Sequence, residues 1–297
     1  MKPLQGKVAV VAGSSRGAGR GIALALGDAG ATVYVAARTS RKGPKPADGA
    51  PGTVEDTADE VTARGGKGIP VRADLSDEKQ VAALFRRVEK DHGRLDLLAS
   101  SAWSANFMAV WHRRFWDLGS AIWRETMETM AAYWLTSVHA ASIMTKQRSG
   151  LIVHVTDNLY PDPSAHRGQI LHDLGHEFIN RLVMDLSLAA KKSKIAVFGL
   201  NPKALKKTGR LLGACDLAKE YGFTDVDGRV PNFARAWEQN LESAMAAGGP
   251  PDAAERFMGP ARYAMIHNTP AKRELALRLM ERHRMGRLPE GLRPVQA

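Results

Sequence analysis

The sequence predicts an α/β fold, a doubly wound parallel sheet of six to seven strands with helices on both faces. Short apolar runs of five or six residues alternate with longer segments of helical period, which is the pattern of βαβ units. A glycine-rich turn follows the first apolar run directly. The chain has 297 residues, of which 44% are hydrophobic and 25% charged, as expected for a folded protein with a sizeable core.

The apolar runs place the strands, and the segments between them place the helices. Strands are expected at residues 8–12, 32–37, 68–72, 95–99, 151–156 and 195–200. Helices are expected at residues 18–29, 53–64, 77–91, 121–147 and 168–191. Six strands joined by helical crossovers imply one sheet covered on both faces.

The last part of the chain departs from this alternation. Residues 230–297 contain helical patterns that are separated by proline-containing breaks. We therefore expect one domain at residues 1–230 and a C-terminal helical extension at residues 231–297. This extension is expected to cover the site or an interface, in the same subunit or in a neighbour.

The formal net charge is +11, but the basic excess is dispersed along the chain. Residues 1–50 hold eight basic and two acidic side chains, and residues 252–297 hold nine and five. A nucleic-acid-binding protein gathers its charge on one face or stripe, so we expect no nucleic-acid partner. No apolar run reaches the roughly 18 residues of a membrane span, and we expect neither a signal peptide nor a membrane partner. The single cysteine, Cys215, suits a reducing compartment, which predicts a cytoplasmic protein.

The first strand leads into the glycine-rich turn of residues 12–23, which opens a helix. Small residues let the backbone approach a pyrophosphate, and a helix N-terminus supplies N–H groups and partial positive charge. A tight turn without a ligand is the alternative, but a position between strand and helix is the one that a Rossmann-like dinucleotide site requires. The residues expected to hold the cofactor here are Gly13, Ser15, Arg16, Gly17, Ala18 and Gly19.

The end of the second strand favours NADP(H) over NAD(H). NAD-selective sites hold an acidic residue about 20 residues after the turn, whereas this chain has Arg38 and Thr39. Arg38 and Arg16 could pair with a ribose 2′-phosphate, because the planar guanidinium matches phosphate oxygens. The alternative is that both are solvated surface arginines.

These residues together resemble the short-chain dehydrogenase/reductase family. Residues 12–19 resemble its Thr-Gly-x3-Gly-x-Gly motif, with Ala12 in the threonine position. Residues 208–229 resemble the last strand and its tail in one branch of that family. The resemblance implies that Asp74 and Leu75, after the third strand, contact the adenine. Asp74 could instead cap the helix that follows.

Two further segments of the resemblance concern the cofactor. Residues 100–103, Ser-Ser-Ala-Trp, stand where the family has Asn-Asn-Ala-Gly. The resemblance implies close cofactor contacts at Ser100, Ser101 and Ala102, because these residues are small. Pro202 stands where the family has a proline after the sixth strand, but the helical lid that follows it in the family is missing here.

The resemblance ends at the catalytic residues. The family uses a Ser after the fifth strand, a Tyr-x3-Lys pair on the next helix and an Asn on the helix before. Asp157 stands in the Ser position, and His172 and His176 stand in the Tyr and Lys positions. No Asn occurs between residues 107 and 157. On a helix, two residues four apart share one face, and Asp157 is expected to point toward them.

Four interpretations of this substituted site remain open. The first is an NADP(H)-dependent reductase of a C=O, C=N or C=C bond, in which Asp157 or His172 delivers the proton and His176 replaces Lys at the ribose. Tyr160 is a further candidate donor. The second is a non-redox isomerase, lyase or cyclase that uses the same groups. The third is a metal site, with His172, His176 and either Asp157 or His166 as ligands. The fourth is an inactive nucleotide-binding protein.

Aromatic residues suggest the substrate class and the assembly. The segment at residues 103–119 is rich in Trp and Phe, and is expected to wall a pocket for a small hydrophobic, ring-containing substrate. Trp123, Tyr133 and Trp134 on the long helix are expected to be buried, in the chain or at a subunit interface. We expect a homodimer or a homotetramer.

Overall fold

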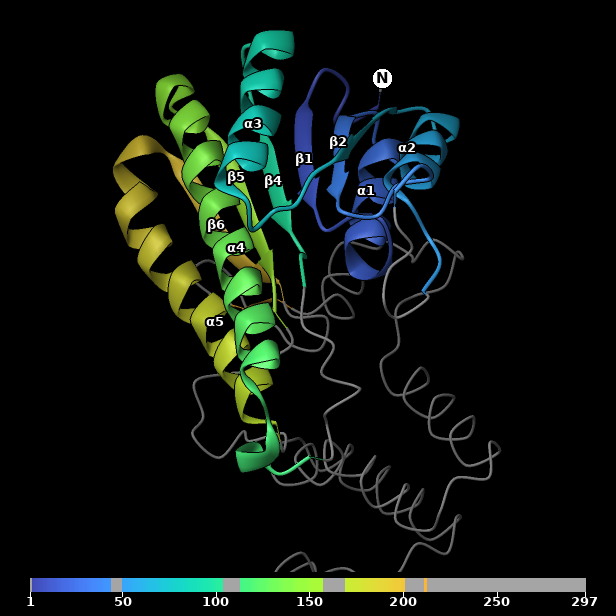
Figure 1. Ribbon diagram of the computed structural model, residues 1–297. Helices are drawn as coiled ribbons and strands as arrows, with labels where there is room; N and C mark the ends of the chain where they lie inside the picture. The colour runs from blue at the N-terminus through green and yellow to red at the C-terminus, as the bar shows by residue number, and fades with distance from the viewer. Residues whose placement is uncertain (1, 44–49, 104–112, 157–168, 201–210, 213–297) are drawn as a thin grey trace, which may run out of the picture. The chain divides into compact units, whose positions relative to one another are not determined.

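The computed structural model describes residues 2–43, 50–103, 113–156, 169–200 and 211–212 (Figure 1). Seven parallel strands form one sheet in the order β3-β2-β1-β4-β5-β6-β7. The strands are β1 (Val8–Ala12), β2 (Thr32–Ala37), β3 (Lys67–Arg72), β4 (Leu97–Ser100), β5 (Gly150–Val155), β6 (Ile195–Leu200) and β7 (Leu211–Leu212). Strand order reverses beside β1, so the crevice of a doubly wound sheet opens at the carboxyl ends of β1 and β4.

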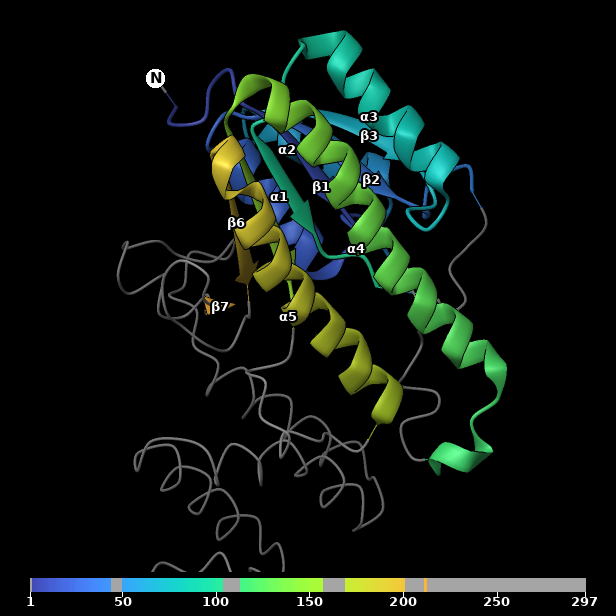
Figure 2. The ribbon, with the colours of Figure 1, turned by 90° about the vertical axis from the view of Figure 1, so that its left-hand side faces the viewer.

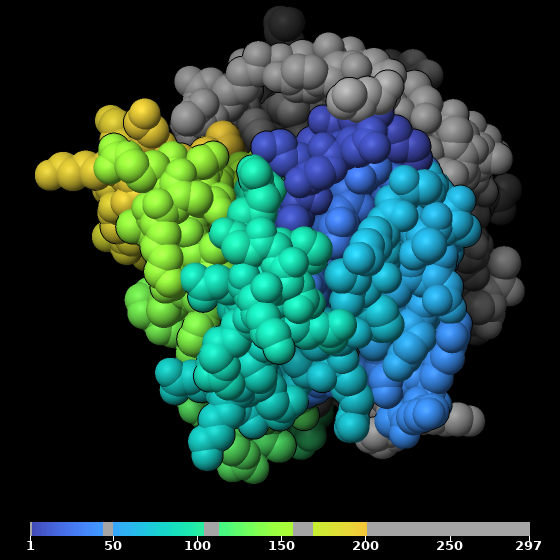
Figure 3. All heavy atoms as spheres, turned by 90° about the horizontal axis from the view of Figure 1, so that it is seen from above, coloured from blue at the N-terminus to red at the C-terminus, as the bar shows by residue number. Residues whose placement is uncertain are grey.

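The helices form two layers, one on each face of the sheet (Figures 1 and 2). They are α1 (Gly17–Asp28), α2 (Val54–Ala63), α3 (Glu78–His92), α4 (Ser120–Gln147) and α5 (Ile170–Ala190), with short 3-10 turns at Phe115–Asp117 and Lys191–Ser193. In the space-filling view of Figure 3, residues of α4 and α5 lie on one side of the molecule and those of α2 on the other.

Alternation along the strands explains the two layers. Val10 and Ala12 of β1 belong to the core beneath α3, α4 and α5, whereas Val11 belongs to the core beneath α1 and α2. Since successive side chains of a strand point to opposite faces, a strand buried on both faces must be apolar throughout. All five residues of β1 are buried, which accounts for its continuous apolar run.

The predicted fold class is confirmed, and the strands and helices expected between residues 8 and 200 are present within about two residues of their expected bounds. The largest differences, of two residues, are at the start of α5, which is at Ile170, and at the start of β4, which is at Leu97 rather than at residue 95. The Leu95 N–H donates to Oε1 of Gln147, and Oδ2 of Asp96 accepts from the Val8 N–H, so side chains hold this segment before the ladder begins.

Two sequence predictions concern residues that the structure does not describe. The domain boundary near residue 230 and the C-terminal helical extension lie outside the described residues. Among the helices that are described, none has both the length and the apolar character needed to cross a membrane.

Candidate functional site

The turn between β1 and α1 is built on glycine. Gly13 has a φ of +80°, and a Cβ atom there would lie 2.6 Å from Cα of Ala102. A Cβ atom at Gly19 would collide with the Gly13 carbonyl oxygen. These glycines therefore let the turn pack against both the end of β4 and the first turn of α1.

The start of α1 offers its N–H groups to a ligand. Arg16 occupies the N-cap position without a capping side-chain hydrogen bond, and the first turn contains no acidic residue. Gly17 has a φ of +58°, and no heavy atom of the described chain lies within 4 Å of the place where its Cβ would be. An uncapped helix start beside open space suits an anion such as a pyrophosphate.

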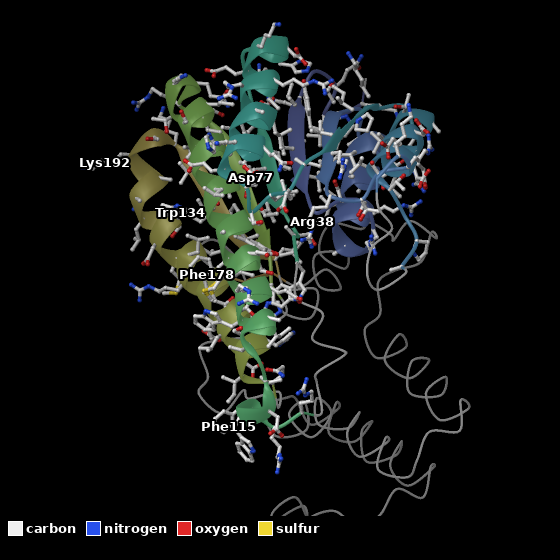
Figure 4. All side chains as sticks on the ribbon, in the orientation of Figure 1. Arg38, Asp77, Phe115, Trp134, Phe178 and Lys192 are labelled. Carbon is white, nitrogen blue, oxygen red and sulfur yellow. The ribbon has the colours of Figure 1, made fainter. Side chains whose placement is uncertain are left out.

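Arg16 and Arg38, the two arginines expected to pair with a 2′-phosphate, both make side-chain contacts. Nη2 of Arg16 donates a hydrogen bond of 2.9 Å to Oγ1 of Thr39, which ties the glycine turn to β2. Nη1 of Arg38 lies 3.6 Å from Oε2 of Glu128 on α4. Neither arginine is therefore merely solvated, and Arg38 is labelled near the carboxyl end of the sheet in Figure 4.

Asp74 and Leu75 lie at the end of β3, where the adenine is expected. Oδ1 of Asp74 accepts hydrogen bonds from the backbone N–H and the hydroxyl of Ser76, at 2.9 and 2.7 Å. Asp77 caps α3, because its side chain accepts from the backbone N–H groups of Lys79 and Gln80. The alternative that Asp74 caps this helix is therefore wrong. Leu75 is only 5% exposed, and its side chain belongs to the core.

The end of β4 contacts the glycine turn through its backbone. The Ser101 N–H donates to the Ala12 carbonyl over 2.8 Å, and Ala102 packs against Gly13. Ser100 is fully buried, and its hydroxyl lies 3.2 Å from Oγ1 of Thr136 on α4. The Ser100 side chain is therefore engaged with α4, whereas the backbone of residues 101 and 102 borders the turn.

The structure brings His172 and His176 together at the N-terminal half of α5. Their ring centroids are 4.5 Å apart, and the Trp103 indole stacks on His176 at 4.4 Å with an interplanar angle of 14°. Nδ1 of His176 lies 3.2 Å from Oγ1 of Thr156, at the end of β5, and Nδ1 of His172 lies 3.4 Å from Oδ1 of Asp173. Asp157, Tyr160 and Pro202 lie outside the described residues.

Carboxylates line the neighbouring stripe of α5. Burial raises the pKa of Glu177, and the negative charge of Asp173 raises it further. Within the described ranges, no group of three or more His, Cys, Asp and Glu side chains could hold a metal ion. The metal interpretation needs Asp157 or His166, which lie outside those ranges, so it stays a hypothesis.

A buried hydrogen-bond network, which the sequence did not predict, holds the end of β5. The Tyr133 hydroxyl on α4 donates to the Val155 carbonyl over 2.7 Å, and Oγ of Ser137 lies 3.0 Å from Nε2 of His154. Ser137 donates its own proton to the Tyr133 carbonyl, so it accepts from His154 Nε2. Burial lowers the pKa of His154 to about 3, and the histidine is therefore neutral at pH 7.

Several aromatic residues lie elsewhere than predicted. Tyr133 is 2% exposed, as expected, but Trp123 and Trp134 are about half exposed, so their predicted burial is wrong within the single chain. Positions 123 and 134 are three helical turns apart and share a stripe that faces away from the sheet. Phe115 and Trp116 are also exposed and stack edge to face on each other, so they do not wall a pocket within the described chain (Figure 4).

The chain belongs to the short-chain dehydrogenase family, whose profile matches residues 7–211. The family consists of oxidoreductases that use NAD(P)(H) and bind small-molecule substrates. The parallel sheet and the glycine turn of this chain are those of the family. Among curated proteins, dehydrogenase/reductase SDR family member 1 of Mus musculus is 30% identical over 278 residues, covering 76% of this chain and 85% of that protein. Its Homo sapiens counterpart is 29% identical over the same shares.

Solved structures agree with the family assignment. A metagenomic short-chain oxidoreductase in complex with NADP is 26% identical, with a TM-score of 0.58 over 68% of this chain and 83% of that one. A dehydrogenase-like structure from Xanthomonas campestris has a TM-score of 0.61 over 77% of this chain and 94% of that one, at 20% identity, which supports the fold alone.

Proposed function

We propose that this oxidoreductase uses NADP(H) to reduce a C=O, C=N or C=C bond of a small hydrophobic, ring-containing substrate. The observation that carries the cofactor proposal is the hydrogen bond between Arg16 and Thr39, beside Arg38 at the end of β2. It supports a pair of cations where a 2′-phosphate would lie, with no acidic residue in β2 or the two residues after it. The bound NADP complex of a related structure agrees with this choice.

The glycine turn would hold the pyrophosphate, and residues 101 and 102 would border the rest of the cofactor. The chemistry that bound NADPH would supply is the transfer of a hydride from its nicotinamide. The chain itself must then orient the substrate, exclude water and deliver a proton.

His172 and Asp157 are the proposed proton donors, with Tyr160 as a further candidate. Asp173 lies beside His172 and can orient its ring, and an imidazole exchanges protons near neutral pH. His176, in the position of the family's lysine, is proposed to act next to the ribose. The proximity of the two histidine rings supports this assignment, because both side chains can serve one reacting centre.

Cofactor choice is tested by titrating NADPH and NADH against nicotinamide fluorescence. We expect Arg38→Ala to weaken NADPH binding by about tenfold, the loss of one charged hydrogen bond, and to leave NADH binding unchanged. Arg41→Ala is the matched control, because Arg41 lies nearby but is paired with Asp56 and Asp59. Absence of NADPH binding by the unaltered protein, or equal weakening of both cofactors, would overturn the proposal.

Reaction type is tested with NADPH and a panel of cyclic ketones, imines and enones. Oxidation of NADPH that depends on one of these compounds supports reduction, whereas turnover without net oxidation would favour the isomerase or lyase alternative. We expect His172→Phe to abolish turnover and to preserve NADPH affinity. Unchanged turnover in this variant would exclude His172 as the donor.

The predicted homodimer or homotetramer is supported by apolar side chains on the outer faces of α4 and α5, two helices that lie side by side (Figure 2). The exposed members are Trp123, Trp134, Val138, Ile170, Leu174, Met184 and Leu188. Contiguous apolar surface of this kind is rare on monomers, and we propose that a second copy of the chain covers it.

A further inference from the structure

Trp103 occupies the position at which the family has a glycine, directly after the end of β4. Its indole packs against Ile122 of α4 and against the buried cluster that Tyr133 of α4 forms with Ile179 and Leu182 of α5. Gly175 makes room for it, because a Cβ atom there would lie 3.2 Å from the indole edge. The tryptophan is therefore built into the helix pair rather than attached to its surface.

The stack with Trp103 fixes the plane of the His176 ring. The two rings are nearly parallel, with centroids 4.4 Å apart, and His176 is 6% exposed. His172 meets His176 edge to face, at an interplanar angle of 60°. With one face stacked and the opposing helix close by, the imidazole has little room to rotate.

The Thr156 hydroxyl contacts the edge of the His176 ring. Its Oγ1 lies 3.2 Å from Nδ1 of His176, and its side chain is fully buried. The threonine is itself held by backbone bonds, since its N–H donates to the Leu200 carbonyl and the preceding Val155 carbonyl accepts from Tyr133. A hydroxyl either donates to an unprotonated Nδ1 or accepts from a protonated one, so each direction of this buried hydrogen bond goes with one neutral tautomer of the imidazole.

We propose that Trp103 and Thr156 are positioning residues for His176. Trp103 fixes the orientation of the ring, and Thr156 fixes which of its nitrogens carries the proton. This inference rests on the proposed function only in giving His176 a part in the reaction. It assigns a role to the Gly-to-Trp difference: the ring that replaces the family's lysine needs a support that a flexible lysine does not.

The test is nitrogen NMR of the full chain labelled with 15N-histidine, at a pH where His176 is neutral, with the resonances assigned by His176→Gln. We expect the two ring nitrogens of His176 to give well-separated resonances, one typical of a protonated and one of an unprotonated nitrogen. Thr156→Ser keeps the hydroxyl and should keep this separation. Thr156→Val keeps the shape but removes the hydroxyl, and should move the two resonances toward their average.

Trp103 is tested by the pair Trp103→Phe and Trp103→Leu. Phenylalanine can still stack and should preserve the ring-proton shifts of His176, whereas leucine should remove the ring-current shift and broaden the resonances. Melting temperatures show whether each variant is folded, and the threonine pair remains informative if Trp103→Leu does not fold. Unchanged His176 nitrogen resonances in folded Thr156→Val would overturn the inference.

The same samples separate this inference from the proposed function. NADPH titration of the unaltered protein tests the cofactor proposal, whereas the histidine resonances report on the ring without any cofactor. A fixed tautomer in a protein that does not bind NADPH would refute the proposed function and leave the positioning role intact. Averaged tautomers in a protein that binds NADPH would refute the positioning role and leave the proposed cofactor intact.

Discussion

Nη1 of Arg38 lies 3.6 Å from Oε2 of Glu128, so a carboxylate of α4 already pairs with the guanidinium proposed to bind the 2′-phosphate. Both side chains are about half exposed, which limits the strength of the pair. The carboxylate and the phosphate would compete for one cation. Under the proposed function, Glu128 would therefore lower the affinity for NADP(H) that the two arginines could otherwise provide.

Replacing Glu128 by Gln should tighten NADPH binding by about two- to fivefold, as expected for an exposed ion pair worth up to about 1 kcal/mol. NADH lacks the 2′-phosphate, so its dissociation constant should stay the same. Fluorescence titrations at low and high salt measure both, and the difference should shrink as salt screens the charges. An equal gain for both cofactors would mean that Glu128 acts elsewhere in the site.

Gly13→Ala should disrupt the glycine turn. The new Cβ would lie 2.6 Å from the Ala102 backbone, at a φ of +80° that alanine adopts with difficulty. We expect a loss of about 2–4 kcal/mol in the free energy of unfolding, together with weaker NADPH binding. Gly21→Ala, within α1 and with open space at the place of the new Cβ, should instead stabilise by up to about 1 kcal/mol. Urea unfolding of both variants makes the comparison, and equal stability would contradict the packing argument.

The sheet and the glycine turn could be predicted because their signals are local. Apolar periodicity fixes each strand within a short window, and residues 12–19 are contiguous in the sequence. The order of the residues in the turn therefore carries most of its chemistry.

The support of His176 could not be predicted in the same way, because it joins three distant segments. Trp103 follows β4, Thr156 follows β5 and His176 lies on α5, and only the register of the folded sheet brings them together. Similarly, Trp123 and Trp134 are as apolar as the core-facing residues of α4. The sequence therefore could not show that these two side chains point away from the sheet.

His154 should make the protein less stable in acid. Its pKa is about 3 in the folded protein and about 6.5 when unfolded, so the unfolded state binds the extra proton as the pH falls below 6.5. The free energy of unfolding should thus be unaffected by His154 above pH 6.5 and fall by about 1.4 kcal/mol per pH unit between pH 6.5 and about 3. Urea unfolding at pH 7, 6 and 5 measures this slope. His154→Leu removes the titrating group, and a variant that retains the full slope would assign it to other residues.

Trp134→Glu should weaken self-association through the outer faces of α4 and α5. The Trp134 side chain is 49% exposed in the single chain, at the centre of the apolar stripe, and a carboxylate buried there by a second copy would be left unpaired (Figure 4). We expect light scattering to report a dimer or tetramer for the unaltered protein and a smaller species for the variant, with an unchanged circular dichroism spectrum. Lys67→Glu changes an exposed charge on the edge strand β3, which packs against α2, and should leave the assembly as it is. A Trp134→Glu variant with the same mass as the unaltered protein would place the subunit contact on another surface, because an interface seldom tolerates an unpaired charge at its centre.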